Sequence, residues 1–313
     1  MASKQLLTIF GATGNQGGSV IDTALSHPDL KAKYALRGIT RDPSSAKAQA
    51  LASNGVEMVQ ADLNDVESMK KAIAGSYGVF GVTDFWAVMS KDIEIQQGKN
   101  IFEACKSQGV KHYVFSTLPY AEKLTAGVLK HVDHFDSKAI VGEYIEANKG
   151  DMIASYFMPA MFINFVKSQI QAINGTPMLN MPFPSESIAW PLIDPRRDGG
   201  KWVMGLFEGG SSANGVKVHA ASTWTTPKEV VAAVGMEAGQ EVVFNAIPKD
   251  VFAGYIPENI RDEITETMLL VGDFSYYGKG AEKQQSEHDK WLVPGTEPIS
   301  FEQWVKENGP WKF

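Results

Sequence analysis

Three glycines spaced as Gly-x-x-Gly-x-x-Gly follow the first β-rich run of the chain, and they constrain its fold more than any other feature. Gly11, Gly14 and Gly17 lie between the apolar run 6–10 and the amphipathic stretch 14–26. In a strand–turn–helix unit, the first glycine permits a tight turn, the second lets a pyrophosphate approach the backbone, and the third lets the helix pack close to the strand. The free N–H groups at the helix start favour an anion. The sequence therefore predicts a dinucleotide-binding loop, with contacts from Gly11, Thr13, Gly14, Asn15, Gln16 and Gly17.

The rest of the first half alternates short β-rich runs with amphipathic stretches. Strands are predicted at 6–10, 34–40, 56–60, 77–82, 112–116 and 153–157, and helices at 14–26, 45–53, 65–74, 92–108 and 135–148. This alternation is typical of right-handed βαβ crossovers, and it predicts an α/β fold with a doubly wound Rossmann parallel sheet.

Beyond Pro159 the alternation is lost and five prolines punctuate the chain between residues 177 and 195. We expect a Rossmann domain over residues 1–157 and a smaller C-terminal α/β domain over 158–313 on the substrate or partner side. Part of the second domain, about residues 189–224 and including the run 202–207, is expected to pack back on the first.

The residues after the second predicted strand select the nucleotide. An acidic side chain there binds the ribose 2′-hydroxyl of NAD, whereas an arginine accommodates the 2′-phosphate of NADP. The segment reads Thr40-Arg41-Asp42-Pro43, so Arg41 predicts NADP as the cofactor. A shift of one residue would instead place Asp42 at the ribose, and Arg41 would then be a solvated loop cation.

Two further strand ends are expected to line the same cleft, because ligands bind at the carboxyl edge of such a sheet. Asp62 and Leu63 follow the third strand, where Asp62 could accept the adenine amino group and Leu63 could flank the ring. Asp62 could equally cap the helix that begins near Asp65. Val82 and Thr83 end the fourth strand and are assigned to the cofactor by position.

Composition excludes several classes of function. Lys and Arg total 29 and Asp and Glu total 36, a formal net charge of −7, and no basic run is present, so direct nucleic-acid binding is not expected. The single cysteine, Cys105, fits a reducing compartment. We find no targeting segment and no span long enough for a membrane, and expect a soluble cytoplasmic protein, with the nucleus as a second location. His131, His134 and Asp136 could in principle bind a metal, but no further ligand cluster accompanies them, and we expect none.

The sequence resembles the NmrA-like family of atypical short-chain dehydrogenase/reductases. The loop Gly-Ala-Thr-Gly-Asn-Gln-Gly-Gly at 11–18, the turn at 40–43 and the segment His-Phe-Asp-Ser-Lys at 134–138 carry the resemblance. It implies NADP(H) binding by Gly11, Gly14, Gly17 and Arg41, adenine contacts at Asp62 and Leu63, Lys138 at the nicotinamide ribose, and Pro159 to Phe162 beside the nicotinamide. One departure is Phe157, where the sensor branch of the family often carries an arginine.

The catalytic pattern of short-chain dehydrogenases is incomplete in this chain. Their Tyr-x-x-x-Lys places both side chains on one helix face, where the lysine holds the ribose and the tyrosine donates the proton. Lys138 is present, but His134 replaces the tyrosine. Histidine can exchange protons near neutral pH, so Lys138 and His134 are the candidate catalytic residues. His134 could equally be a polar residue at a helix start.

Two functions follow from these residues. The first, which the missing tyrosine favours, is a redox or nucleotide sensor that binds NADP(H) and regulates a protein partner such as a transcription factor. The alternative is an NADPH-dependent reductase of a small carbonyl or enone substrate, using Lys138 and His134. The apolar segment 158–165 favours this alternative if it lines a pocket together with Phe183 and Trp190. The sequence leaves the oligomeric state open.

Overall fold

Seven parallel strands form the main sheet of the computed structural model, which describes residues 3–313. Their spatial order is β11-β6-β5-β4-β1-β2-β3. The strands are β1 (Gln5–Ile9), β2 (Tyr34–Thr40), β3 (Glu57–Gln60), β4 (Gly78–Gly81), β5 (His112–Ser116), β6 (Ile153–Pro159) and β11 (Lys217–Ala220). The strand order reverses between β1 and β4, and a crevice at that point is where doubly wound folds bind their ligands. The predicted Rossmann fold class is confirmed.

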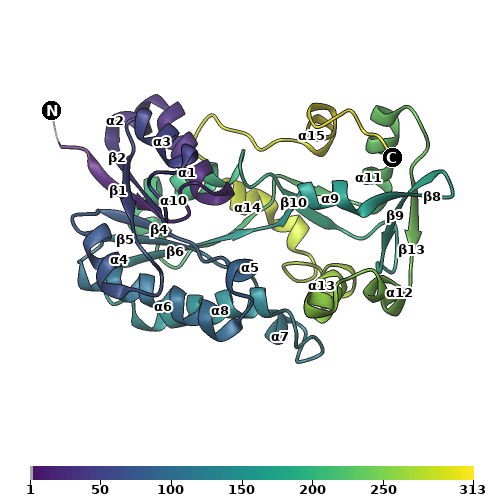
Figure 1. Cartoon of the computed structure of the whole chain (residues 1–313), viewed down its shortest axis with the longest axis horizontal. Helices are drawn as coiled ribbons and strands as arrows, with labels where there is room; N and C mark the ends of the chain where they lie inside the picture. The colour runs from purple at the N-terminus through teal and green to yellow at the C-terminus, as the bar shows by residue number, and fades with distance from the viewer. Residues whose placement is uncertain (1–2) are drawn as a thin grey trace.

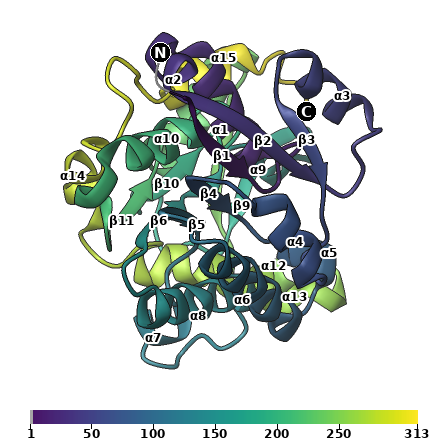
Figure 2. The same ribbon diagram turned by 90° about the vertical axis from the view of Figure 1, so that its left-hand side faces the viewer.

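Both faces of the main sheet are covered by helices, because successive side chains of each strand point to opposite faces. Val114 belongs to one apolar cluster, whereas its neighbours Tyr113 and Phe115 belong to the other. Figure 2 shows α1, α2 and α10 on one side and α4, α6 and α8 on the other. The helices of this half are α1 (Asn15–Ser26), α2 (Pro28–Lys33), α3 (Ala46–Ser53), α4 (Val66–Ile73), α5 (Phe85–Val88), α6 (Lys91–Ser107), α7 (Ala121–Leu124), α8 (Asp133–Asn148) and α10 (Gly199–Gly209).

The remaining strands form two small sheets at the other end of the molecule (Figure 1). One contains β12 (Thr223–Thr225), β10 (Trp190–Ile193) and β7 (Met161–Phe162), and the other contains β13 (Val243–Ala246), β9 (Thr176–Met181) and β8 (Ile170–Ile173). The helices here are α9 (Asn164–Gln169), α11 (Pro227–Ala238), α12 (Lys249–Gly254), α13 (Arg261–Leu269), α14 (Gln285–Asp289) and α15 (Phe301–Glu307), with a π-helix at Leu270–Phe274 and 3₁₀ turns at Gly210–Ala213, Glu258–Ile260 and Ala281–Gln284.

Residues from the second half of the chain return to the main sheet. Helix α10 packs on α1, and the backbone N–H of Gly200 donates a hydrogen bond to Ser19 Oγ at 2.8 Å. A β-carbon at Gly200 would lie 2.1 Å from the Ser19 carbonyl oxygen, so a glycine is required for this close helix contact. Strand β11 pairs in parallel with β6 and extends the sheet beyond the six predicted strands. The domain boundary at 157/158 stays a prediction.

Helix α1 ends at Ser26, as predicted. Pro28 begins a further short helix, α2, that the sequence analysis did not foresee, because proline at the first helical position loses no hydrogen bond. Helix α8 begins at Asp133, two residues before the predicted start, and the groups that satisfy its first N–H donors come from α13, far along the chain.

Candidate functional site

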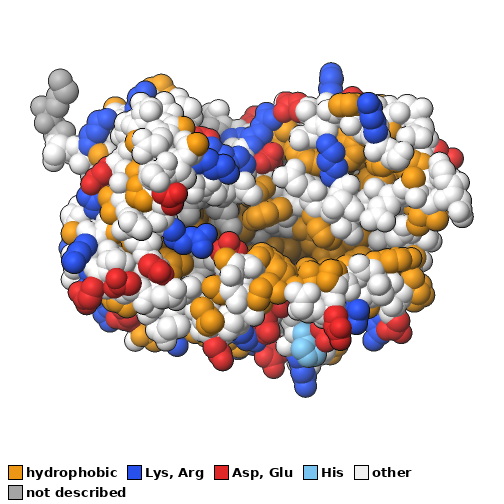
Figure 3. All heavy atoms as spheres, in the orientation of Figure 1, with side chains coloured by type: hydrophobic (Ala, Val, Ile, Leu, Met, Phe, Trp, Pro, Cys, Tyr) orange, Lys and Arg blue, Asp and Glu red, His pale blue; other side chains and the backbone are white. Residues whose placement is uncertain are grey.

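A cleft of about 1060 Å³ runs along the carboxyl edge of the main sheet and continues towards the small sheets. Figure 3 shows a hollow in the middle of the molecule whose walls carry many hydrophobic side chains. Every residue that the sequence analysis assigned to the cofactor or to catalysis lines the cleft: Gly11, Thr13, Gly14, Asn15, Gln16, Gly17, Arg41, Asp62, Leu63, Val82, Thr83, His134, Lys138, Pro159 and Phe162.

The glycine loop forms one end of the cleft and leaves the start of α1 without a side-chain cap. Gly11 has a φ of +62°, a conformation that side chains disfavour. A β-carbon at Gly17 would lie 2.4 Å from the backbone oxygens of Phe10 and Gly11, so only glycine lets α1 approach β1 this closely. Gly14 caps α1 without a side-chain hydrogen bond, and the first turn carries no acidic residue. In contrast, side chains cap α4 and α6. The uncapped N–H groups of α1 suit an anionic ligand.

Arg41 and Asp42 lie side by side at the next part of the cleft but differ in their partners. The carboxylate of Asp42 accepts hydrogen bonds from the Ser44 N–H at 2.8 Å and the Ser44 hydroxyl at 2.5 Å. These bonds lower the pKa of Asp42. The Arg41 side chain is exposed and forms no hydrogen bond or ion pair with any residue in 3–313. Of the two, Arg41 therefore has the charged group that is free to meet a ligand.

Asp62 does not cap α4, which was one of the two roles considered for it. Its carboxylate accepts hydrogen bonds from the N–H and the side-chain amide of Asn64, at 2.8 and 3.0 Å. The cap is Asp65, whose carboxylate accepts from two N–H groups of the first helical turn. Asp62 therefore shapes the exposed loop after β3, and its contact with adenine stays a prediction.

Lys138 lies in the middle of the cleft wall and forms an ion pair that the sequence analysis did not foresee. Its ammonium contacts the carboxylate of Glu94 and lies 3.2 Å from the hydroxyl and 3.4 Å from the carbonyl oxygen of Thr83. Glu94 is fully buried on α6 and also accepts hydrogen bonds from the hydroxyls of Thr83 and Ser137. Burial lowers the pKa of Lys138, and the charge and hydrogen bond of Glu94 oppose this effect.

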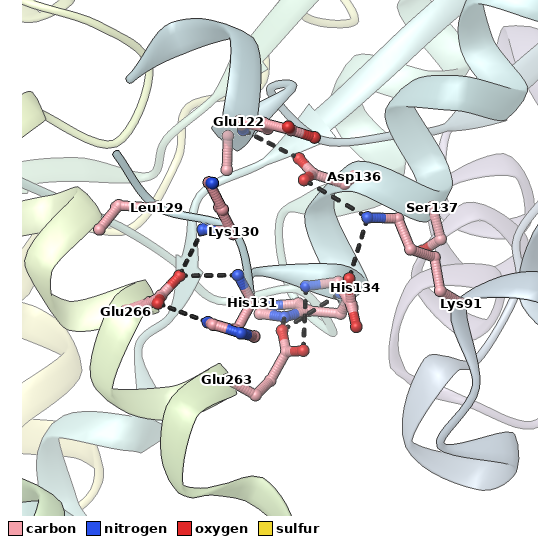
Figure 4. A network of polar contacts seen from close by, with 12 residues as sticks. Lys91, Glu122, Leu129, Lys130, His131, His134, Asp136, Ser137, Glu263 and Glu266 are labelled. Atoms are coloured by element: carbon pink, nitrogen blue, oxygen red, sulfur yellow. Dashed lines mark hydrogen bonds and ion pairs between the residues drawn. The ribbon is translucent and has the colours of Figure 1, made fainter. Parts of the chain in front are cut away.

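His134 lies one helical turn before Lys138, and its ring is held by a carboxylate from the other half of the chain. Nδ1 of His134 hydrogen-bonds to Glu263 on α13, and Glu263 also accepts from the backbone N–H groups of Asp133 and His134 at 2.9 and 3.2 Å (Figure 4). Because a carboxylate only accepts hydrogen bonds, the Nδ1 atom carries a proton. No residue in the described chain hydrogen-bonds to Nε2, the nitrogen left for a ligand.

A second carboxylate of α13 repeats this arrangement one turn further along. Glu266 accepts from the backbone N–H groups of Lys130 and His131, both at 2.7 Å, and from Nδ1 of His131 at 2.7 Å (Figure 4). This hydrogen bond raises the pKa of His131. Together Glu263 and Glu266 attach α13 to the segment that leads into α8. His131 and His134 thus bind separate carboxylates, and within residues 3–313 no group of three or more His, Cys, Asp or Glu side chains could hold a metal ion.

The end of the cleft beyond His134 is apolar. Its walls are formed by side chains of α5, α8, α13, the segment after β6 and the loop after the π-helix: Phe85, Trp86, Phe135, Met161, Phe162, Phe165, Ile264, Met268 and Tyr276. The ring centroids of Trp86 and His134 are 5.2 Å apart, so the histidine belongs to this aromatic surface. Helix α13 presents Ile264, Thr267 and Met268 to the cleft while the two glutamates anchor it.

Phe183 and Trp190 do not line this pocket, contrary to expectation. Both are fully buried and pack against each other edge to face, with ring centroids 5.3 Å apart. Aromatic side chains in β-rich runs are more often core than ligand wall, and here the small sheets need them as core. The expected part that does line the pocket is the segment containing Met161, Phe162 and Phe165.

The sequence analysis missed Glu94, Glu263 and Glu266. Each is far in sequence from the residue that it binds, and glutamates on amphipathic helices are usually solvated. Only Glu94 could have been recognised from the sequence pattern. It lies four residues after the Ser90 cap of α6, on the same helix face as the buried Gly98 and Ile101. Separately, no helix within the described residues has the length and hydrophobicity needed to cross a membrane.

The strand order, the glycine loop and the cleft together define a Rossmann protein with a cleft at the carboxyl edge of its main sheet. The chain belongs to the NmrA-like family, whose model matches residues 3–305. An NmrA-like family domain-containing oxidoreductase of Aspergillus hancockii is 30% identical over 293 residues, covering 87% of this chain and 83% of the relative. Another, from Aspergillus japonicus, is 28% identical over 304 residues, covering 90% and 88%.

Among solved structures, that of NmrA, described as a negative transcriptional regulator, superposes with a TM-score of 0.82 at 22% identity, covering 98% of this chain and 96% of NmrA. This likeness establishes a common fold. The family resemblance read from the sequence is confirmed.

Proposed function

We propose that this protein is an NADP(H)-dependent oxidoreductase that reduces a small apolar carbonyl or enone compound. The first part of the proposal is nucleotide binding. The cleft begins at a helix start that lacks both a side-chain cap and an acidic first turn, and it continues past Arg41 to Lys138. Backbone N–H groups and cations at intervals suit a ligand that carries several phosphates and two riboses.

Arg41 and Asp42 support NADP(H) over NAD(H). The carboxylate of Asp42, which could have bound a ribose hydroxyl, is engaged with Ser44 of its own loop. Arg41 has an exposed guanidinium with no partner in residues 3–313, and a guanidinium can bind a phosphate through two parallel hydrogen bonds. The 2′-phosphate that distinguishes NADP from NAD is the group that would occupy this position.

The observation that carries the catalytic part is the apolar end of the cleft, which is reached by Nε2 of His134. A site that only sensed nucleotide would need no apolar space next to Lys138, whereas a reductase needs room for a substrate there. Relatives named as oxidoreductases, including those of Aspergillus hancockii and Aspergillus japonicus, support an enzyme as well.

The residues of this chain have distinct roles in the proposed reaction. NADPH bound in the cleft would supply the hydride. Lys138 would hold the nicotinamide ribose through its ammonium. His134, oriented by Glu263 through Nδ1, would donate a proton from Nε2 to the carbonyl oxygen of the substrate, the role that tyrosine has in other short-chain dehydrogenases. The aromatic walls would exclude water from the reacting groups.

The test is NADPH oxidation with a panel of enones, quinones and aromatic ketones, comparing the wild type with His134→Ala. As a general acid, His134 should contribute roughly 10²–10⁴-fold to turnover. His131→Ala is the matched control, because that histidine binds the neighbouring carboxylate but does not line the cleft. Turnover that survives His134→Ala but is lost in Lys138→Ala would reject the histidine role.

A second candidate is a nucleotide sensor that regulates a protein partner such as a transcription factor. The replacement of the usual tyrosine by His134 favours it, and the similarly folded NmrA is described as a regulator. In a sensor, His134→Ala would leave NADPH affinity nearly unchanged and no compound of the panel would be reduced. Tight NADPH binding without turnover would therefore favour this second candidate.

A further inference from the structure

We propose that Glu94 is a positioning residue, which keeps the Lys138 ammonium charged and fixed in the cleft wall as a nucleotide anchor. In this role Lys138 does not deliver the substrate proton. The proposal rests on the proposed NADP(H) binding and adds a residue outside the cleft to the machinery of that site. Three observations on the buried cluster around Glu94 support it.

The carboxylate of Glu94 is completely buried, and both of its oxygens accept hydrogen bonds. It accepts hydrogen bonds from the hydroxyl of Thr83 at 2.7 Å, from the hydroxyl of Ser137 and from the ammonium of Lys138. These donors come from the loop after β4 and from α8. A buried ion pair is often no more stabilising than apolar residues of the same volume. Stability alone is therefore a weak reason for a glutamate at this position.

The contacts of Lys138 hold its ammonium in the wall of the cleft. The three N–H groups of an ammonium here have three acceptors: the carboxylate of Glu94, and the hydroxyl and carbonyl oxygens of Thr83 at 3.2 and 3.4 Å. The side chain is 10% exposed and lines the cleft. Because the contacts with Thr83 are long, a ribose hydroxyl in the cleft would compete with Thr83 for an N–H group, while the ion pair with Glu94 is kept.

The charge of Lys138 depends chiefly on Glu94. Burial lowers the pKa of Lys138, since it disfavours the charged form, and the largest opposing contribution comes from Glu94 on α6. Asp84 in the loop after β4 and Glu263 on α13 oppose it more weakly, and His134, one turn earlier on α8, lines the same cleft. Glu94 is the carboxylate in direct contact. Without it, a buried ammonium would lose its proton more readily.

The experiment uses Glu94→Gln in the full chain, because the amide keeps the size of the side chain without its charge. The amide oxygen can still accept from Thr83, whereas the amide nitrogen replaces the oxygen that accepts from Ser137. Dissociation constants for NADPH are measured by fluorescence between about pH 7 and about pH 9.5, a range over which free lysine stays charged. We expect a nearly constant affinity for the wild type. For Glu94→Gln we expect the affinity to fall about tenfold across this range, as Lys138 loses its proton and its charge-assisted hydrogen bond.

Two controls separate charge from structure. Asp92→Asn removes an exposed carboxylate from the same helix, and Ser137→Ala removes one hydrogen bond to Glu94 without changing any charge. Both should retain the flat profile of the wild type. In a Lys138→Ala background, Glu94→Gln should add no pH dependence, because the titrating group is absent.

A second measurement needs no ligand and separates the two proposals. NMR titration of the Lys138 Nζ signal should show a lower pKa in Glu94→Gln than in the wild type. Glu94→Asp keeps the negative charge but places it further from Lys138, so it should lower this pKa by less. An unchanged Lys138 titration, or a flat binding profile in Glu94→Gln, would overturn the role of Glu94. Failure of the wild type to bind NADPH would instead refute the proposed function, whatever the titration shows.

Discussion

Replacing Arg41 with alanine should remove most of the preference for NADPH over NADH. The guanidinium lines the cleft, and it has no competing partner in the described residues. A phosphate bound there would form charge-assisted hydrogen bonds, each contributing ~1.5–3 kcal/mol. Because Arg41 is exposed, water and salt screen part of this interaction, so the lower limit applies. About 1.5 kcal/mol corresponds to roughly a tenfold loss of NADPH affinity.

The assay is a titration of NADPH and NADH against the wild type, Arg41→Ala and Lys47→Ala. Lys47 also lines the cleft and is exposed, so its removal controls for a general loss of positive charge. NADH has no 2′-phosphate, and its affinity should change little in Arg41→Ala. The reasoning is refuted if the wild type binds both nucleotides equally, or if Arg41→Ala weakens NADH as much as NADPH.

Three further changes test the glycine loop, a buried histidine and the attachment of α13. Gly17→Ala should abolish NADPH binding while circular dichroism stays native, because the new β-carbon would lie 2.4 Å from the Gly11 carbonyl oxygen; normal binding would show that the loop is not the site. Burial lowers the pKa of His112 to about 4, so acidification from pH 7 to 5 should cost about 2 kcal/mol of unfolding free energy. Urea titrations should show a smaller loss in His112→Gln, and equal losses would contradict this. Glu266→Gln should lower the pKa of His131 in an NMR titration, and an unchanged value would mean that the contact is absent in solution.

The sign of the His112 effect follows from proton binding. The ring is completely buried, with Nε2 2.9 Å from the Ser155 hydroxyl and Nδ1 without a hydrogen bond within residues 3–313. It is neutral in the native state, whereas an unfolded histidine gains a proton below about pH 6.5. The unfolded chain therefore binds more protons between about pH 6.5 and 4, and stability decreases as the pH falls through this range.

Helix α13 both binds the segment that carries His134 and lines the proposed substrate pocket. One face of the helix binds the α8 start through Glu263 and Glu266, and another face presents Ile264 and Met268 to the apolar end of the cleft. Any movement of α13 would therefore change the shape of the proposed substrate pocket and the hold on His134 together. The pair Tyr276 and Tyr277 follows shortly after, and their hydroxyls donate to the carbonyl oxygens of Pro159 and Met158 at 3.0 and 2.8 Å.

The Rossmann half of the protein and its glycine loop could be predicted from the amino-acid sequence alone. Alternating strands and amphipathic helices predicted the parallel sheet, because hydrophobic periodicity is a local property that survives without knowledge of the tertiary fold. The spacing of Gly11, Gly14 and Gly17 predicted the tight loop for the same reason: backbone conformation and close approach restrict those positions to glycine. Arg41 was found from its place after the second predicted strand, and Lys138 from the family resemblance.

The contacts of those residues could not be predicted from the sequence, because they depend on how distant elements pack together. Glu94 and Lys138 are in contact although they are 44 residues apart in the sequence, and Glu263 and His134 are 129 residues apart. Nothing in the local pattern distinguishes these glutamates from solvated ones, since pairing between distant helices depends on how the whole chain packs. The early start of α8 has the same origin, because its first N–H groups are satisfied by α13. Likewise, Phe183 and Trp190 belong to the core, and Met161 and Phe162 line the cleft, because burial is decided by neighbouring elements and residue type alone does not reveal it.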